Sequence, residues 1–391
     1  MKTTGTDQQL LLGMEDGDIT PRLVSEVFDP SRLTQARRLS ELTKKELAER
    51  VGVTPAAVGQ YETGVARPRP ELISRLSQVL DAPIAFFMAG RPSSRLDASM
   101  TYFRSLRSTP KAMREKAAAF AEQVWELTNA LERRVRLPYV DVPGFAGGEV
   151  HPGLVVPDEP VAAARELRKL WGLGDGPVTH LTRRMESHGI VVVLPPRADS
   201  AAATVDAFSS RLTRPLVVLT HNRADDVYRH RFTAAHELGH LLLHSEATGD
   251  SRQEREADAF AAEFLTPKSS ILPALPSRMD LARLAELREI WGVSVHSLVY
   301  RCREVGLFSD ATASRAYQKL RVLAEQPGFA PEPVSGFPGE QPVLLSQAFE
   351  LAATETGLTV ESLARELCWK PERVRELLGV PDQRPVLHLV R

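Results

Sequence analysis

The chain has 391 residues, of which 43% are hydrophobic, and its 49 basic and 50 acidic side chains leave a formal net charge of −1. This length predicts two or three domains with real cores. No apolar run approaches the roughly 20 residues of a membrane span, and the first residues lack a signal-peptide pattern. The two cysteines, Cys302 and Cys368, are far apart in the sequence. The composition therefore argues against a membrane protein or a disulfide framework and predicts a cytoplasmic protein whose cysteines fill the core.

The N-terminal part is expected to hold a helix-turn-helix. Residues 1–28 show no sustained periodicity and are expected to be a flexible tail. Further on, Thr43-Lys-Lys-Glu46 forms a capping box at the start of a helix over residues 44–51. Gly52 ends that helix, and Thr54-Pro55 begins the next one. Two short helices separated by a glycine turn are typical of a helix-turn-helix, whose second helix enters the major groove of DNA.

Residues 32–87 resemble the Xre/Cro/C1 family of helix-turn-helix repressors, through Leu47-Ala-Glu-Arg-Val-Gly-Val-Thr54, Tyr61-Glu62-Thr-Gly64 and Leu72-Ile-Ser-Arg-Leu-Ser-Gln-Val-Leu80. The resemblance implies a five-helix, lambda-repressor-like domain at residues 29–90 that binds a double-stranded DNA operator. It also favours a homodimer, because such proteins usually span two half-sites. The groove-facing positions that it implies are Thr54, Pro55, Ala56, Gly59 and Gln60, and the phosphate contacts are Lys44, Lys45 and Arg67.

Two features of this surface temper the expected base reading. Gln60 can hydrogen-bond an adenine edge and Ala56 can touch a thymine methyl group. However, Lys44 stands where the family commonly has glutamine, and the groove-facing positions carry few long polar side chains. We therefore expect part of the sequence preference to come from DNA shape. The alternative is a helix-turn-helix that is used only for protein contacts.

Residues 91–160 are expected to form a linker helix and a loop. Thr109-Pro110 predicts the start of a long helix that runs to about Arg136, with apolar positions alternating by three and four. Such a seam fits either a dimer contact or a helix that lies on the following domain. The stretch 138–160 is rich in glycine and proline and is expected to be a linker or surface loop.

Residues 161–330 are expected to form a second domain. A helix over 161–171 precedes three β-type runs at 189–194, 204–209 and 215–220. We expect these runs to form a small sheet, with 204–209 as an edge strand. Such an edge can bind an extended peptide by strand addition.

The chemistry of this domain is expected to centre on a His-Glu-x-x-His motif. His236 and His240 are four residues apart on a predicted helix, so both imidazoles project from one face and can bind one metal ion. The expected ion is Zn2+, with Mn2+ as an alternative. Glu237 lies at the edge of that face, where its carboxylate can take a proton from water activated by the ion. For an oxyanion partner, Tyr228 and His230 are candidates.

A zinc site with two histidines needs a third protein ligand. We expect Glu254, with Glu256 in reserve, and Asp258 to orient a ligand histidine. His244 is a competing ligand, but it lies about 12 Å along the helix axis from His236 at 1.5 Å per residue. We therefore interpret it as a polar residue at the helix end.

Residues 160–330 also resemble the ImmA/IrrE metallopeptidases. The resemblance rests on Trp171-Gly-Leu-Gly, Val205-Asp-Ala-Phe-Ser209, the run from Arg231 to His244, Glu254 to Pro267, and Trp291-Gly-Val-Ser294. It implies a zincin-like domain and a zinc-dependent, gluzincin-like endopeptidase that cleaves a helix-turn-helix repressor under stress or in mobile elements. On these positions it implies His236, His240 and Glu254 as metal ligands and Glu237 as the catalytic glutamate.

Residues 331–391 are expected to be a proline-rich linker and a helical module. A shift of 316 residues places Thr43, Leu47, Ala48 and Pro55 on Thr359, Leu363, Ala364 and Pro371, so the module is expected to repeat the helix-turn-helix pair. Its second helix balances Arg373 and Arg375 with two glutamates, which favours packing or partner binding over DNA reading. The fold class expected for the whole chain is α+β, mainly helical, with one small β-sheet.

Three functions remain open at this point. The first is a DNA-binding transcriptional regulator with a zinc endopeptidase that cleaves a repressor or its own linker near 138–160. The second is a transcription factor whose metal domain senses a ligand or metal and cleaves nothing. The third is a scaffold with neither activity. An intact Glu237 favours the first over the second.

Overall fold

A computed structural model describes residues 19–92, 101–103, 110–143, 145, 156–195, 207–211, 214–219, 225–244 and 250–380. The chain divides into two compact units. Unit 1 comprises Met1–Ala98, Pro110–Arg136 and Leu345–Arg391, and unit 2 comprises Ser99–Thr109 and Leu137–Leu344. The chain is mainly helical, as expected. Among the described residues, no helix is long and apolar enough to cross a membrane.

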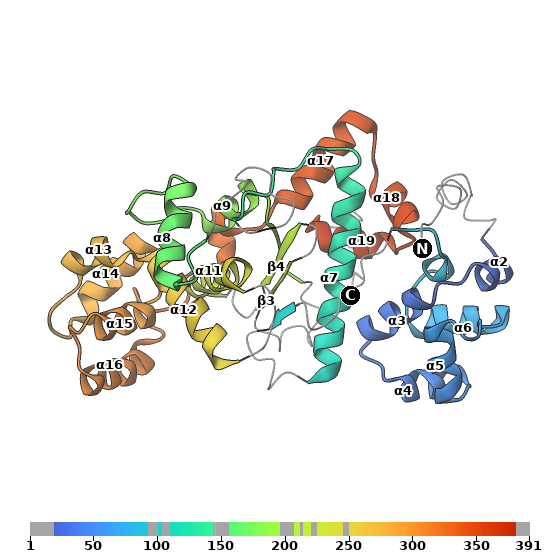
Figure 1. Cartoon of the computed structure of the whole chain (residues 1–391), viewed down its shortest axis with the longest axis horizontal. Coiled ribbons are helices and arrows are strands. Elements are labelled where there is room, and N and C mark those ends of the chain that lie inside the picture. Colours follow the sequence, from blue (N-terminus) through green and yellow to red (C-terminus); the bar gives the residue numbers. More distant parts are fainter. Residues whose placement is uncertain are drawn as a thin grey trace, which may run out of the picture. The chain divides into compact units, whose positions relative to one another are not determined.

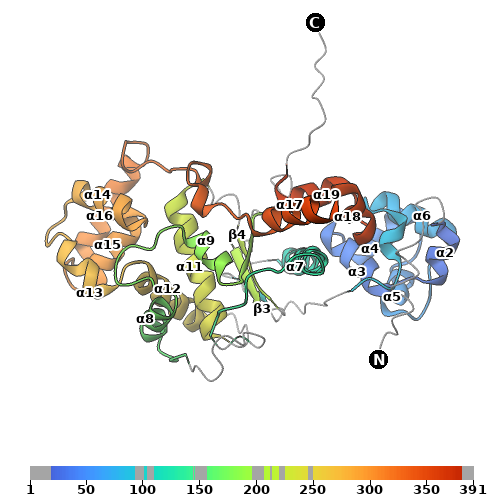
Figure 2. The ribbon, with the colours of Figure 1, turned by 90° about the horizontal axis from the view of Figure 1, so that it is seen from above.

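The helix-turn-helix region of unit 1 is built from five α-helices that cluster together in Figures 1 and 2. Four of them begin with proline at the first helical position, where its missing N–H costs no hydrogen bond. The capping box expected at Thr43 is present, and Gly52 ends its helix in the left-handed region with φ 75°. The helices are α2 (Pro21–Glu26), α3 (Pro30–Leu39), α4 (Lys44–Val51), α5 (Pro55–Thr63) and α6 (Pro70–Val79), followed by the short 3-10 helix η1 (Ile84–Phe87).

The first helix, α2, lies inside the stretch expected to be a flexible tail. Thr20 caps it by accepting a hydrogen bond from the backbone N–H of Leu23, and Val24 is fully buried. The helix packs against α6 and η1. The expected tail therefore does not extend to residue 28, because the N-cap and one buried valine stabilise this short helix. Residues 1–18 lie outside the described part of the chain.

The long helix α7 (Lys111–Glu132) packs against α3 and α18 (Val360–Leu367) in unit 1. It ends four residues before the expected Arg136, and Thr109 lies outside the described residues. The buried side chain of Glu126 accepts hydrogen bonds from Arg32 and, at 3.0 Å, from Gln35 of α3. A helix expected to face a dimer partner or the next domain thus packs within unit 1.

The C-terminal module of unit 1 consists of α17 (Leu344–Thr356), α18 and α19 (Pro371–Leu378). Helices α18 and α19 begin 316 residues after α4 and α5, as the internal repeat predicts. Cys368 takes the place of Gly52 and has a left-handed φ of 53°. Arg373 of α19 donates to the side-chain oxygen of Gln123 on α7 at 2.8 Å, which fits the packing role expected for this pair.

Unit 2 contains a four-stranded sheet of order β1-β3-β4-β2. Strand β3 (Ala207–Arg211) is antiparallel to β4 (Pro215–Leu219), and β2 (Val191–Val193) is parallel to β4. Strand β1 (Thr101–Phe103) comes from the segment before α7 and pairs antiparallel with β3, with Tyr102 opposite Ser209. The expectation that residues 204–209 form an edge strand is therefore wrong, because a distant segment covers that edge. Residues 204–206 lie outside the described chain.

The helices of unit 2 surround one apolar core that includes Trp171, Leu238, Phe260, Phe264 and Trp291. Helix α11 lies against β3, β4 and α12, and the pair α11 and α12 is visible in Figure 1. Both cysteines are free and buried, as expected of core residues. The helices are α8 (Pro160–Leu170), α9 (Leu181–Ser187), α11 (Val227–Leu243), α12 (Ser251–Leu265), α13 (Lys268–Ile271), η4 (Leu272–Ala274), α14 (Leu281–Trp291), α15 (Val295–Glu304) and α16 (Asp310–Leu323).

Single residues of two stretches expected to be linkers are buried in unit 2. In the first, Val142 and Phe145 are buried. In the second, the 3-10 helices η5 (Val334–Gly336) and η6 (Pro338–Glu340) lead to Glu340, which is 3% exposed. The Glu340 carboxylate accepts hydrogen bonds from the backbone N–H groups of Leu181 and Thr182 at 2.9 and 3.1 Å. Pro331, Pro333 and Pro338 of the second stretch remain exposed, so it is their neighbours Val334 and Glu340 that are buried.

Candidate functional site

The two histidines of the motif meet because α11 is a regular helix buried against the sheet. Asp226 caps its start by accepting from the backbone N–H of Tyr228 at 3.1 Å. His236 and His240 are 0% and 2% exposed, and their Nε2 atoms lie 3.0 Å apart. The spacing of four residues therefore brings both imidazoles to one point inside unit 2, as expected.

Helix α12 supplies the third group because it approaches α11 very closely. Gly239 lies between the two histidines, and a Cβ atom there would meet the ring of Phe260 at 3.0 Å and the backbone of Ala257 at 3.3 Å. The bare glycine thus lets α12 lie against α11. Glu254, in the first turn of α12, places its carboxylate oxygens 3.6 Å from His236 Nε2 and 3.5 Å from His240 Nε2.

The arrangement of these three side chains fits a zinc ion. Two imidazoles and one carboxylate are a common donor set of catalytic zinc sites. Bonds of about 2.0–2.1 Å in a tetrahedral site require ligand atoms about 3.4 Å apart. The two Nε2 atoms are 3.0 Å apart, and each lies 3.5 or 3.6 Å from a different oxygen of the Glu254 carboxylate, which is close to that value. His236, His240 and Glu254 are therefore able to hold one metal ion, and their ligand atoms all lie within 4.8 Å of one another.

The other ring nitrogen of each histidine is also held. His236 Nδ1 lies 2.8 Å from Asp258 Oδ1, as expected of a residue that orients a ligand. His240 Nδ1 lies 2.9 Å from His244 Nδ1, and His244 Nε2 lies 3.0 Å from Glu256 Oε2. His244 is the C-cap residue of α11, as expected of a polar residue at the helix end, but it is buried against His240, and the reserve ligand Glu256 is turned toward it. Sequence reasoning missed that His244 contacts His240 and Glu256, although the spacing of four residues between His240 and His244 was a signal.

Glu237 is completely buried beside the metal ligands. The hydroxyl of Ser209 on β3 donates to Glu237 Oε2 at 2.7 Å, so the sheet fixes this carboxylate. The Tyr228 hydroxyl instead donates to Glu332 at 3.1 Å, and His230 Nε2 lies 3.2 Å from the carbonyl oxygen of Glu340. Both oxyanion candidates therefore contact the segment at 332–340, and their role as oxyanion partners stays a prediction.

The carboxylates around the histidines shift the protonation of the metal-free site. Burial lowers the pKa of His236, but hydrogen bonds to Asp258 and Glu254 outweigh it and raise the pKa to about 9. Burial raises the pKa of Glu254, yet its hydrogen bonds to both histidines bring it down to about 2. Burial lowers the pKa of His240. A metal ion that binds here therefore displaces a proton from His236.

The positions proposed for DNA contact lie together on α4, α5 and the following turn of unit 1. Lys45 is 77% exposed, whereas Lys44 lies 3.3 Å from the buried carboxylate of Glu62. The Thr54 hydroxyl accepts from the backbone N–H of Ala57 at 3.2 Å, so it caps α5. Arg67 donates to the carbonyl oxygen of Glu26. Gly59 is half-buried, and the remaining positions are exposed: Pro55, Ala56 and Gln60.

Comparison with known proteins agrees with both parts of this geometry. Residues 33–87 match the family model described as helix-turn-helix. Residues 185–303 match the model described as IrrE N-terminal-like domain, a metallopeptidase family. The chain joins a helix-turn-helix domain to an IrrE N-terminal-like domain. Both resemblances found in the sequence are thereby confirmed. The matches support a regulator that carries a DNA-binding domain and a protease-like domain.

One relative adds a more distant similarity. The vegetative-specific protein H7 of Dictyostelium discoideum is 28% identical over 88 residues, which is 22% of this chain and 83% of that protein. The similarity therefore concerns only a small part of the present chain.

Proposed function

We propose that this protein is a DNA-binding transcriptional regulator whose IrrE-like domain is a zinc-dependent, gluzincin-like endopeptidase. In this proposal the domain cleaves a repressor or the chain itself to control transcription under stress or in mobile elements. The observation that carries the proposal is the convergence of His236, His240 and Glu254 within 4.8 Å, with Glu237 buried next to them. Manganese is an alternative ion for the same donors.

The residues of the chain divide the work of peptide hydrolysis among them. A bound zinc ion would polarise the scissile carbonyl and acidify water. Glu237, fixed by Ser209, takes the proton from the attacking water and later gives it to the leaving amine. Asp258 and His244 hold the Nδ1 atoms of the two ligand histidines, so that both Nε2 lone pairs face the same point.

The helix-turn-helix domain would bring this activity to an operator. We propose that α5 enters the major groove with Thr54, Pro55, Ala56, Gly59 and Gln60 toward the bases. Lys44, Lys45 and Arg67 would contact phosphates. Because Thr54 caps α5 and Lys44 pairs with Glu62, Gln60 and Lys45 are the side chains most available to DNA. The proposed homodimer would use a surface other than the side of α7 that packs on α3 and α18.

The pairing of β1 with β3 supports the chain itself as a target. An extended peptide adds to a sheet at a strand edge, and Thr101–Phe103 lies along β3 in this way. Tyr102 is the register partner of Ser209, whose hydroxyl contacts the proposed catalytic Glu237. A cut in or near this strand would separate α2–α6 from the rest of the chain. The stretch near 138–160 is less suited, since Val142 and Phe145 are buried.

The test is intact mass spectrometry of the full chain after incubation with Zn2+ or Mn2+ and operator DNA, alone and with candidate repressors. We expect metal-dependent fragments from the wild type, and none from Glu237→Gln, which keeps the shape of the side chain and the metal ligands. Equal fragmentation of both proteins would remove Glu237 from the mechanism. Bound zinc without fragments of any protein would favour a non-proteolytic transcription factor whose metal domain senses a ligand.

A further inference from the structure

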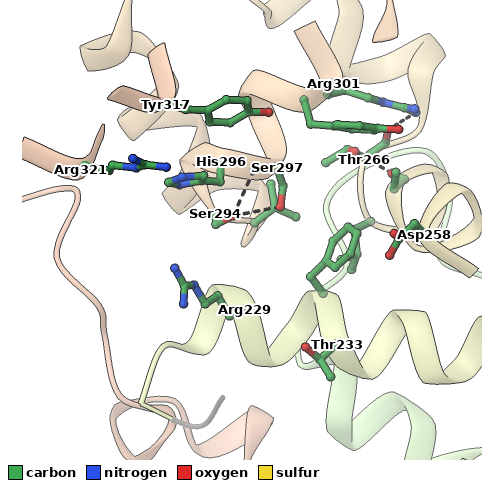
Figure 3. A pocket seen from close by; sticks show the side chains of 15 residues that line it. Arg229, Thr233, Asp258, Thr266, Ser294, His296, Ser297, Arg301, Tyr317 and Arg321 are labelled. Atoms are coloured by element: carbon green, nitrogen blue, oxygen red, sulfur yellow. Dashed lines mark hydrogen bonds between the residues drawn. The ribbon is translucent and has the colours of Figure 1, made fainter. Parts of the chain in front are cut away.

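A pocket of about 530 Å³ lies in unit 2 between α11, α12, α15 and α16, as Figure 3 shows. Its volume is within the range of roughly 300–1,000 Å³ that is typical of small-molecule sites. The pocket borders the metal centre without including it. Asp258 is part of its wall, whereas His236, His240, Glu254 and Glu237 are not among the described residues that line it.

One end of the pocket is positively charged. Arg321 of α16 lies beside His296 there, and Arg229 extends toward both from α11 (Figure 3). Burial and then the charges of these two arginines lower the pKa of His296, so both guanidinium groups act on the same space. Arg229 has a carboxylate neighbour, Asp226, at 3.6 Å and remains 58% exposed. This end can therefore take an anionic group.

The guanidinium of Arg301 in the pocket wall has a different role. It donates to Glu304 at 2.6 Å and to the carbonyl oxygen of Thr266 at 2.7 Å, and it also donates to Glu263. The side chain is 3% exposed. Arg301 therefore joins α15 to the end of α12, and the charge at the open end comes from Arg229 and Arg321.

The walls between the two ends are apolar and aromatic. Phe232, Leu265 and Tyr300 line them, and the rings of Tyr317 and His296 stack at 5.2 Å with an interplanar angle of 19°. Tyr300 is 50% exposed, so its ring is available to a bound molecule. Aromatic surface beside a pair of cations suits a molecule with an apolar or planar body and an anionic head.

The far end of the pocket reaches a residue that controls the metal centre. Asp258 is 44% exposed, and its carboxylate is bonded to His236 Nδ1 at 2.8 Å. The Nε2 atom of His236, on the opposite side of the ring, is the one that faces Glu254 and His240. A molecule in the pocket can thus compete for or reinforce the hydrogen bond to His236.

We propose that this pocket binds a small organic anion and that its occupancy changes the metal affinity of the neighbouring site through Asp258. The anionic head lies between Arg229 and Arg321, and the apolar body runs along Tyr317 and Phe232 toward α12. The site makes the IrrE-like domain a ligand sensor whether or not it cleaves protein, so this proposal does not depend on peptidase activity.

Binding is tested on the full chain with two fluorescent probes that share one aromatic skeleton. The first, 8-anilinonaphthalene-1-sulfonate, carries an anionic group, and N-phenyl-1-naphthylamine lacks it. We expect the sulfonate to bind more tightly, and Arg229→Gln with Arg321→Gln to weaken it at least about tenfold, since one hydrogen bond to a charged group contributes roughly that factor. The uncharged probe should not respond. Arg315→Gln, an exposed arginine on α16 outside the pocket, is the matched control.

Two results would overturn the assignment of the site. One is an unchanged sulfonate affinity in the double arginine variant. The other is displacement of the sulfonate by a peptide that the domain cleaves, which would make the pocket a substrate site. Filling the pocket by Ser297→Phe gives a second, independent variant, which should exclude both probes while circular dichroism shows an intact fold.

The coupling to the metal is tested by zinc titration with and without saturating sulfonate probe. We expect zinc affinity to fall about fivefold or more, and zinc to weaken probe binding by the same factor, since coupling between two sites is reciprocal. Asp258→Asn should reduce that factor. Equal zinc affinities with and without the probe in the wild type would refute the coupling, even if the probe binds.

Discussion

The contact between His240 and His244 yields the sharpest prediction for the metal centre. His244→Phe keeps a ring of similar size but removes the partner of His240 Nδ1 at 2.9 Å. It also removes the contact with Glu256 at 3.0 Å, but that carboxylate is 29% exposed and can be hydrated. The main effect of the substitution should therefore be that the ring of His240 is no longer held in its orientation. Outer partners of ligand histidines typically contribute about 10- to 100-fold in metal affinity, or about 1.4–2.7 kcal/mol.

The measurement is zinc affinity of the purified full chain by competition with a chromophoric chelator. Glu256→Gln should give a smaller loss than His244→Phe, because the amide oxygen still accepts a hydrogen bond. Glu237→Gln is the matched control and should keep wild-type affinity. Wild-type affinity in His244→Phe would refute the orienting role and leave His244 as packing. A loss as large as that of Glu254→Ala would instead make His244 a direct ligand.

Three further predictions concern other parts of the chain. Gly239→Ala places a Cβ 3.0 Å from the Phe260 ring, so unfolding should be easier by about 1–3 kcal/mol and zinc binding weaker; an unchanged melting temperature would show that α12 can move. Burial raises the pKa of Glu186 from 4.5 to about 7. Its contribution to stability is then full below pH 4.5 and declines as pH rises through 7, by up to about 3 kcal/mol, and Glu186→Gln should flatten this slope in denaturant titrations. Lys45→Gln should lower the slope of log affinity for operator DNA against log salt by about 0.9, and an unchanged slope would remove Lys45 from the phosphate contacts.

Local signals in the sequence predict much of the helical structure. Thr43 and Glu46 form the expected capping box, and the repeat at a shift of 316 residues gives the starts of α18 and α19. These features depend on neighbours within one turn, so the sequence contains what is needed. The convergence of His236 and His240 is predictable for the same reason, because helical spacing decides which side chains share a face. The approach of Glu254 depends instead on the packing of α12 against α11.

Nonlocal packing accounts for what the sequence left open. The pairing of Thr101–Phe103 with β3 joins segments about a hundred residues apart, and three residues carry no periodic signal. The proline-rich stretch near 331–342 was expected to be a linker, because prolines mark irregular backbone. Prolines do not reveal whether neighbouring side chains are buried. There the Glu340 carboxylate binds the backbone at the start of α9 and the side chain of Arg231. Such a charge becomes informative only when its partners are known.

The two proposed ligand histidines are held by different residues. This difference makes it possible to test metal binding and ligand sensing separately. His240 is held by His244, which in turn contacts Glu256, and neither His244 nor Glu256 lines the pocket among the described residues. His236 is held by Asp258, which does line it. An anion in the pocket should thus act on one ligand and spare the other. In His244→Phe the probe should still shift zinc affinity by its wild-type factor, whereas in Asp258→Asn the factor should shrink. Equal loss of the shift in both variants would mean that the pocket acts on the metal centre as a whole and not through Asp258.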